Sequence, residues 1–339
     1  ARNYGGYKLE SANLPNLGGI QPPFSNSQTL AIPDDLIFEH ILPRLPVKSL
    51  IQFNSVCKSW YNFISSSQFA KSHLKFSSAS PHFLLLKDLF GIQGIFREFN
   101  LLSYDEHDEN MRLAQLDYQL PEFNREYYVV GCCNGLICFY FYEALRTVKF
   151  ILWNPATRKC RIISTDFRET LLNCGFGYAS TLEDYKIFGA FYSYADTCTR
   201  VRVFSLTLGE WKQICLSKDD VEIFYSACGM KGVFVDTSLY WYVNKSGGLL
   251  RIICYNLVNE QLREFPVTIE CFYDCVEIEV FKGCLLLRCY ENGYDPSLCE
   301  VWILKKQDDI NSWEKLFSFP FYYAFTFGFL LNWQEFDRA

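Results

Sequence analysis

The sequence predicts a segregated α+β fold, in which a small helical unit is followed by a larger all-β body. Apolar residues recur at helical spacing between residues 32 and 74, whereas short apolar runs separated by turn residues follow from residue 81 onward. Aromatic residues make up 18% of the chain and methionine contributes only two residues, a composition that favours strands. With 339 residues, 50% of them hydrophobic, the chain can bury a sizeable core and has room for two domains.

Residues 31–76 are predicted to form three or four short helices. Asp34 and Asp35 follow Pro33 at a helix start, where acidic side chains suit the unpaired backbone N–H groups. Leu45-Pro46 then interrupts the helix, because the residue before a proline is pushed out of the α region. A unit this small seldom buries enough apolar surface to be stable alone.

Two further features shape these helices. Pro43 has no N–H to donate to the carbonyl of Glu39, so we expect the first helix to end early. The serine run from Ser65 to Ser67 can cap a last helix that carries Phe69 and His73.

The helical unit carries a gapless pattern of apolar, proline and tryptophan positions, IPDDLIFEHILPRLPVKSLIQFNSVCKSW in residues 32–60. This pattern resembles the F-box motif, in the variant of the large plant family with an F-box-associated domain. The resemblance implies that the unit docks on a Skp-type adaptor, and through it on a cullin, within a ubiquitin ligase. The alternative is that these residues are only the core of a small helical subdomain. The resemblance, carried over position by position, implies that the adaptor contacts lie among eleven residues. Some of these residues must fill the core instead. The eleven are Ile32, Pro33, Leu36, Ile41, Leu42, Leu45, Pro46, Leu50, Val56, Cys57 and Trp60.

The all-β body contains a repeat with a constant period. In four segments a β-type run is followed by a polar turn and a second β-type run. Cys160, Trp211, Leu262 and Trp313 occupy the same place in each copy, and each follows the previous one by 51 residues. Units of about fifty residues built from strands and turns are typical of kelch-type propeller blades. We therefore predict a propeller-like domain of five or six blades over residues 77–339, with a β-sandwich as the alternative.

The repeat leaves the closure of this propeller open. Residues 81–131 would form an earlier, degenerate unit, and Phe321 to Trp333 would begin another. The next equivalent of Trp313 falls beyond the last residue. Either the sequence stops short of a full blade, or the last blade borrows a strand from elsewhere.

Short motifs mark hairpins in this body and extend the resemblance. Asn134-Gly135 lies between two β-type runs and is a strong hairpin signal, and further turns are expected at Gly209, Gly247-Gly248 and Asn292-Gly293. GCCNGL at residues 131–136 and WNPATR at residues 153–158 resemble two motifs of the F-box-associated domain. Five tryptophans are expected to pack in the core and between blades rather than form a ligand cage: Trp153, Trp211, Trp241, Trp302 and Trp313.

The sequence lacks the residue constellations typical of an enzyme. Only four histidines occur, and there is no G-x-S-x-G, H-E-x-x-H, Walker-type or G-x-G-x-x-G motif. The fifteen cysteines include no C-x-x-C pair, and their odd number cannot form a full set of disulfides within one chain. We therefore predict no catalytic residue, no metal site and no cofactor, with the cysteines as small buried apolar residues.

Charge and targeting features limit the partners and the cellular location that the sequence allows. The net charge of −6 disfavours nucleic-acid binding through a broad basic surface. Residues 1–30 lack the pattern of a signal peptide and are interpreted as a flexible tail, and Leu316 to Trp333 is interpreted as strands rather than a membrane span. We expect a reducing compartment, the cytoplasm and/or the nucleus, and no membrane partner.

Two functions remain open at this stage. In the first, which the resemblance implies, the β domain presents a target protein for ubiquitination and degradation, and other subunits transfer the ubiquitin. In the second, the propeller is itself an enzyme or sugar-binding module, and the F-box controls its turnover. The missing catalytic constellation favours the first.

An acidic run marks a candidate substrate face. Its charges could steer a basic protein partner, although such runs are usually solvated. We expect the loops from Tyr104 to Arg112 and from Tyr194 to Arg200 to share one propeller rim, and the connection from Phe76 to His82 to be ordered. The acidic residues are Asp105, Glu106, Asp108 and Glu109.

Overall fold

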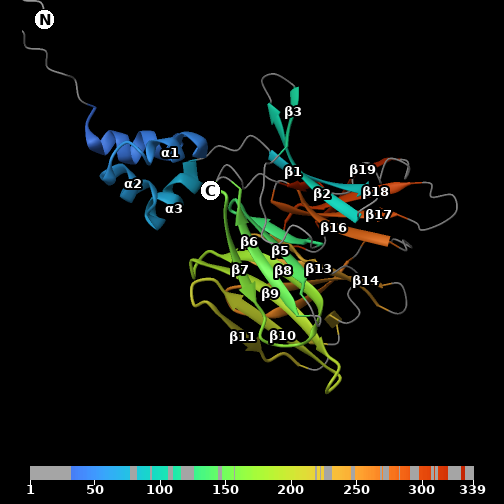
Figure 1. The fold of residues 1–339 in the computed structure, drawn as a ribbon. Coiled ribbons are helices and arrows are strands. Elements are labelled where there is room, and N and C mark those ends of the chain that lie inside the picture. The colour runs from blue at the N-terminus through green and yellow to red at the C-terminus, as the bar shows by residue number, and fades with distance from the viewer. Residues whose placement is uncertain are drawn as a thin grey trace, which may run out of the picture.

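In the computed structural model, short helices form a body beside an array of β-sheets (Figure 1). The predicted tail at residues 1–30, the turns at Gly247-Gly248 and Asn292-Gly293, and the connection between Phe76 and His82 lie outside the described residues. The structure describes residues 32–76, 82–91, 94–105, 110–115, 126–143, 147–155, 157–217, 220–221, 223–224, 231–245, 249–267, 269, 275–281, 283–290, 298–306, 309, 312–319 and 330–332.

The helical unit, residues 32–76, begins where the sequence predicts. The backbone N–H groups of Leu36 and Ile37 both donate to the Pro33 carbonyl, at 3.0 and 3.2 Å. Ser66 caps the last helix, because its Oγ accepts from the N–H of Phe69 at 3.1 Å. The elements are the π-helix η1 (Leu36–Ile41), the 3-10 helix η2 (Leu42–Arg44) and the α-helices α1 (Val47–Phe53), α2 (Lys58–Ile64) and α3 (Ser67–Phe76).

Pro43 changes the pitch of the first helix instead of simply ending it. The N–H of Leu42 donates to the carbonyl of Ile37, five residues back, which is a π-type bond. Pro43 then lies in the first turn of η2, where its missing N–H has no partner to lose. The His40 carbonyl, which an α-helix would bond to the N–H of Arg44, instead accepts from the Arg44 guanidinium at 2.5 Å.

The β domain consists, within the described residues, of five four-stranded antiparallel sheets. The first contains β20 (Leu330–Asn332), β1 (His82–Gly91), β2 (Gly94–Asp105) and β3 (Asn110–Gln115), in that order. The second contains β4 (Tyr128–Cys133), β5 (Leu136–Tyr142), β6 (Val148–Asn154) and β7 (Lys159–Ser164). The third contains β8 (Thr170–Ala179), β9 (Asp184–Ser193), β10 (Cys198–Ser205) and β11 (Glu210–Ile214).

The remaining two sheets repeat this arrangement. The fourth contains β12 (Val233–Val235), β13 (Ser238–Lys245), β14 (Leu249–Asn256) and β15 (Leu262–Pro266), and the fifth β16 (Cys275–Phe281), β17 (Cys284–Tyr290), β18 (Cys299–Leu304) and β19 (Trp313–Phe319). The first strands β4, β8 and β12 contact one another, and β16 contacts β12, so these sheets begin near a common centre and end at the outside. This is the architecture of a β-propeller. The predicted fold class is confirmed, with five blades in the described residues.

A strand from the end of the chain completes the first blade. β20 pairs antiparallel with β1 through Leu330, Leu331 and Asn332, opposite Leu85, Leu84 and Phe83. A strand is therefore borrowed, but by the first blade and not by the last one, which has four strands of its own. Within the segment that we expected to begin another blade, Leu330–Asn332 supply the innermost strand of the first blade.

The 51-residue repeat corresponds to the outer strand of four blades. Cys160, Trp211, Leu262 and Trp313 lie on β7, β11, β15 and β19, the last strand of each sheet. The turn before the strand repeats as well, because Arg158, Gly209 and Glu260 follow one another at the same interval and all have positive φ. Each of the four repeated residues pairs with a residue on the third strand of its sheet. These paired residues are Trp153, Phe204, Tyr255 and Leu304.

The first predicted hairpin is confirmed. Asn134 and Gly135 have φ values of 48° and 74° and join β4 to β5, where Cys133 pairs with Leu136. Two consecutive residues with positive φ form the turn whose twist matches that of paired strands.

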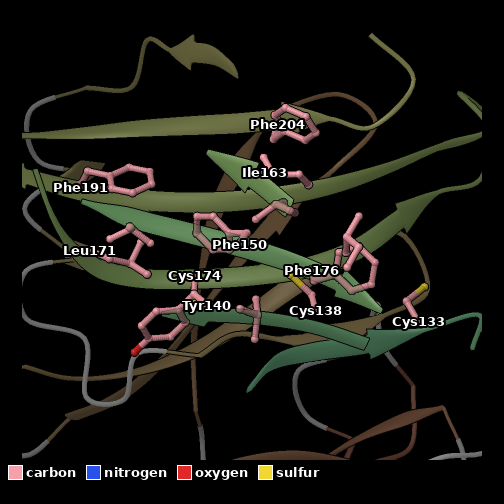
Figure 2. Close-up of a cluster of buried hydrophobic side chains, with 14 residues drawn as sticks. Cys133, Cys138, Tyr140, Phe150, Ile163, Leu171, Cys174, Phe176, Phe191 and Phe204 are labelled. Carbon is pink, nitrogen blue, oxygen red and sulfur yellow. The ribbon is translucent and has the colours of Figure 1, made fainter. Parts of the chain in front are cut away.

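Buried side chains fill the space between neighbouring sheets (Figure 2). One cluster joins the second and third sheets and includes Phe150, Phe176 and Phe204, with the thiols of Cys138 and Cys174 among them. Burial raises the pKa of Cys174 to about 12, so this thiol stays protonated. The five tryptophans are packing residues, as predicted: Trp153 and Trp241 are buried, and Trp211, Trp302 and Trp313 pack against buried clusters.

The cysteines only partly follow the prediction that they are buried. Those of the β domain core, such as Cys138 and Cys289, are buried, and the twelve cysteines whose side chains the structure describes are free thiols. Four others are exposed: Cys57, Cys160, Cys198 and Cys215.

The strand order corrects one expectation about the loops. In each blade the first-to-second and third-to-fourth connections lie on one face, and the second-to-third connections lie on the other, because neighbouring strands are antiparallel. The ends of β2 and β3 belong to a third-to-fourth connection, whereas β9 and β10 are joined by a second-to-third connection. The described ends of the segment from Tyr104 to Arg112 and the loop from Tyr194 to Arg200 therefore lie on opposite faces, not on one rim.

An ion pair marks the face next to the helical unit. Lys71 on α3 contacts Glu183 in the turn between β8 and β9, with 2.5 Å between Nζ and Oε2. That turn is a first-to-second connection, so the loop between β9 and β10 opens on the face away from this contact.

Ending the chain at residue 329 should lower the free energy of unfolding by about 2 kcal/mol, because it removes the backbone hydrogen bonds of β20 at about 1 kcal/mol each. Urea unfolding followed by tryptophan fluorescence measures the change. A chain ending at residue 334 keeps β20 and is the control. Equal stability of the two truncated chains would show that β20 does not fasten the propeller.

Candidate functional site

A small hydrophobic core holds the helical unit together. Leu42, Leu50 and Phe69 are buried, with exposed fractions of 0%, 4% and 3%. Trp60 packs beside this core with its ring edge-on to Phe53, at 5.6 Å between ring centroids. The other side chains that pack against the core are Ile37, Phe38, Leu45, Phe53, Phe63 and Ile64.

Polar contacts fix the junction between η2 and α1 against the last helix. Leu45 is in an extended conformation before Pro46, so its carbonyl has no place in a helical hydrogen-bond series. The buried His73 supplies the partner, because its Nε2 donates to the Leu45 carbonyl at 2.8 Å. The Arg44 guanidinium lies 4.4 Å from the centroid of the Phe76 ring and adds a second contact to α3.

Apolar side chains remain exposed around this core. In a π-helix residues five apart come to neighbouring positions, and Leu36 and Ile41 on η1 are both turned to solvent. On α1 Leu50 takes the core position, which leaves the adjacent Ile51 outside. Exposed apolar groups that gather on a small unit are typical of protein–protein contact sites. The exposed set is Ile32, Leu36, Ile41, Ile51, Val56, Tyr61 and Phe76.

The eleven predicted adaptor contacts fall into two groups. Leu42 and Leu50 are core residues, and Leu45 and Trp60 are partly buried against the core, so these four hold the surface in shape. Their part in docking stays a prediction, as does that of the second group. The second group is exposed and consists of Ile32, Pro33, Leu36, Ile41, Pro46, Val56 and Cys57.

Sequence reasoning missed three members of the exposed set, Ile51, Tyr61 and Phe76. For Ile51 and Tyr61 a signal was present in the helical spacing. Leu50 and Phe53 occupy one face of α1, which places Ile51 on another face. Trp60, Phe63 and Ile64 do the same on α2 and leave Tyr61 outside.

Comparison with known protein families assigns both parts of the chain. Residues 30–72 match the model of the F-box domain, and residues 92–336 match the model of the F-box associated beta propeller domain. The chain belongs to this family of F-box proteins.

Several plant proteins are similar to this F-box protein over most of its length. An F-box/kelch-repeat protein of Arabidopsis thaliana is 29% identical over 297 residues, which cover 84% of this chain and 78% of that protein. The F-box protein CPR1 of the same plant is 25% identical over 317 residues, which cover 85% and 72%. Among solved structures, TolB from Acinetobacter baumannii has a TM-score of 0.44 at 12% identity, over 70% of this chain and 52% of that one.

The predicted acidic substrate loop lies almost wholly outside the described residues. Asp105 ends β2, and Glu106, Asp108 and Glu109 are not described. A role for this loop in binding a basic partner therefore stays a prediction.

The other predicted loop, from Tyr194 to Arg200, neutralises its own charges. A hydrogen bond from the Arg200 guanidinium to Asp196 lowers the pKa of that carboxyl to about 2. Arg200 also contacts the buried Glu169 at 3.1 Å. Tyr194 is 65% exposed and lies edge-on to Tyr192. This loop thus offers an aromatic surface rather than a net charge.

Clusters of metal-ligating side chains and membrane-spanning helices are both absent from the described part of the chain. Among the described residues, no group of three or more His, Cys, Asp or Glu side chains could hold a metal ion. No described helix is long and apolar enough to cross a membrane. The apolar stretch from Leu316 to Trp333 instead contributes residues to β19 and β20.

Leu50→Ala should lower the free energy of unfolding of the helical unit by about 3 kcal/mol, because it leaves a cavity in a core of few side chains. Ile51→Ala, one residue away but exposed, should change it by less than about 0.5 kcal/mol. Urea unfolding of the full chain, followed by helical circular dichroism, measures both. A larger loss for Ile51→Ala would contradict the assignment of Leu50 to the core.

Proposed function

We propose that this F-box protein is the substrate-recognition subunit of an SCF-type ubiquitin ligase. In this proposal the helical unit docks on a Skp-type adaptor, which links it to a cullin. The propeller binds a target protein and holds it for ubiquitination and degradation. The protein itself supplies binding and positioning, and other subunits carry out the transfer.

The exposed apolar set of the helical unit is the observation that carries this proposal. A unit with a core of three buried side chains gains little from keeping Leu36, Ile41 and Val56 in water. Covering them with a partner removes this apolar surface from water, at about 25 cal/mol per Å². The F-box family match supplies the kind of partner, an adaptor of the Skp type.

The contact between the two parts supports a positioning role. Lys71 on α3 pairs with Glu183 in the β8–β9 turn, so the propeller adjoins the helical unit at a defined turn. The opposite face, which carries the loop between β9 and β10, is free of this contact. We further propose that the complex works in the cytoplasm or nucleus, which accords with the free thiols of the described cysteines.

Leu36→Asp combined with Ile41→Asp should weaken binding to a Skp-type adaptor by at least about a hundredfold. Both side chains are exposed in the free protein, so folding is preserved, whereas docking would bury two unpaired carboxylates. Co-purification and calorimetric titration with the adaptor measure the loss.

Leu208→Asp is the matched control, because Leu208 is 72% exposed but lies on the propeller. It should leave adaptor binding unchanged. Adaptor binding by the double variant at the wild-type level would refute the proposed docking surface.

A further inference from the structure

A charge pair joins the third and fourth blades at the outer rim. Lys212 on β11 reaches the turn before β15 in the next blade, where its Nζ lies 2.6 Å from Glu260 Oε2. The other carboxylate oxygen of Glu260 lies 3.6 Å from the Nζ of the buried Lys186. A carboxylate from the turn of the next blade thus neutralises this outer-strand cation.

The preceding pair of blades has the cation but lacks the carboxylate. Arg161 on β7 stands 51 residues before Lys212, and Gly209 stands 51 residues before Glu260. A Cβ on Gly209 would lie 3.7 Å from Arg161 Nη2, so Arg161 faces this turn as Lys212 faces the next one. Among the described residues, the Arg161 guanidinium has no hydrogen-bond or ion-pair partner.

A cleft of about 540 Å³ adjoins this unpaired guanidinium, between the outer strands β7 and β11. Its volume falls in the range of about 300 to 1,000 Å³ that is typical of ligand sites. Figure 2 shows Ile163 and Phe204, two of its lining residues, at the edge of the buried cluster beneath it. The remaining lining includes Ile162, Phe167, Trp211 and Gln213.

The aromatic wall of the cleft is rigidly held. Trp211 is in ring contact with Phe150 and Phe204, at 5.5 and 5.3 Å between centroids. Its Nε1 donates to the Ser164 carbonyl at 3.1 Å, which joins β11 to β7 across the cleft. Because these aromatic side chains are already held in place, a ligand that binds beside the unpaired cation loses little free energy to ordering them.

We infer that this cleft binds an extended acidic segment of a target protein, with a carboxylate side chain at Arg161 and an adjacent apolar side chain at Trp211. The ligand carboxylate takes the place that Glu260 fills in the next blade. A guanidinium binds a carboxylate through two parallel hydrogen bonds, which gives both strength and orientation. β7 is the last strand of its sheet, so its outer edge can also pair with an extended chain. The inference deepens the proposed function and rests on it.

The charges around the cleft favour a single carboxylate over a phosphate group. Asp166 and Glu210 line the same cleft, and both are acidic. They would repel a doubly charged group more strongly than a singly charged one. Arg202, the second arginine of the lining, is already engaged by the buried Glu169.

Fluorescein-labelled peptides with Leu-Glu-Phe, Leu-Gln-Phe, Leu-Lys-Phe or Leu-phosphoserine-Phe at their centre provide the test. Fluorescence anisotropy is measured with the full chain bound to its adaptor. We expect the Glu peptide to bind about tenfold more tightly than the Gln peptide, because one charged hydrogen-bond pair is lost. Arg161→Gln should remove this difference.

Gly209→Glu should also abolish the preference for the Glu peptide, because it supplies the carboxylate that the next blade already has. Glu260 shows that glutamate tolerates the positive φ of this turn. Gly209→Gln matches its size and backbone strain without the charge and should retain the preference. Lys212→Gln, at the equivalent position with an internal partner, should have no effect.

The inference falls if no Glu peptide binds, if Glu and Gln peptides bind equally, or if Arg161→Gln leaves the preference intact. It also falls if the phosphoserine peptide binds most tightly. Adaptor binding is measured on the same preparations. If the chain binds the adaptor but the peptides do not bind as expected, only the proposed cleft is overturned. If the wild-type chain does not bind the adaptor, the proposed function is overturned.

Discussion

The second sheet of the propeller is apolar on both faces, and this constraint governs the architecture. On β5, Ile137, Phe139 and Phe141 point to one side and Cys138 and Tyr140 to the other, and all five are buried. Such a sheet needs a neighbour on each side. A row of blades would leave its two ends uncovered, so the chain closes into a ring, and β20 fastens the last part of the chain to the first blade.

The helical unit is under the opposite constraint. It is too small to enclose all of its apolar residues, and in the described structure its hydrophobic core consists of three buried side chains with others packed against them. Local polar contacts, above all from His73 to the Leu45 carbonyl, fix the segments well enough to define a surface. The exposed apolar side chains are thus a consequence of size, and the same property makes the unit suitable for docking.

The shared strand order and the 51-residue period of the blades make departures from the repeat informative. Lys212 and Arg161 face equivalent turns, but Glu260 in one turn is replaced by Gly209 in the other. In a single irregular fold an unpaired surface arginine would carry little meaning. In a repeat, its neighbour shows which partner is missing and where that partner would lie.

The sequence by itself determined the features that depend on residues close along the chain. The start of the first helix at Pro33, the cap at Ser66, the Asn134-Gly135 hairpin and the 51-residue period follow from local backbone preferences and local spacing. Only the tertiary structure decided the rest, because pairing and burial join residues that are distant in sequence. It set the pairing of β20 with β1, the burial of Leu42 beside the exposure of Ile41, and the opposite faces of the strand ends that flank the two predicted loops. It also brought Arg161 to Gly209 across two blades, a contact that no local pattern specifies.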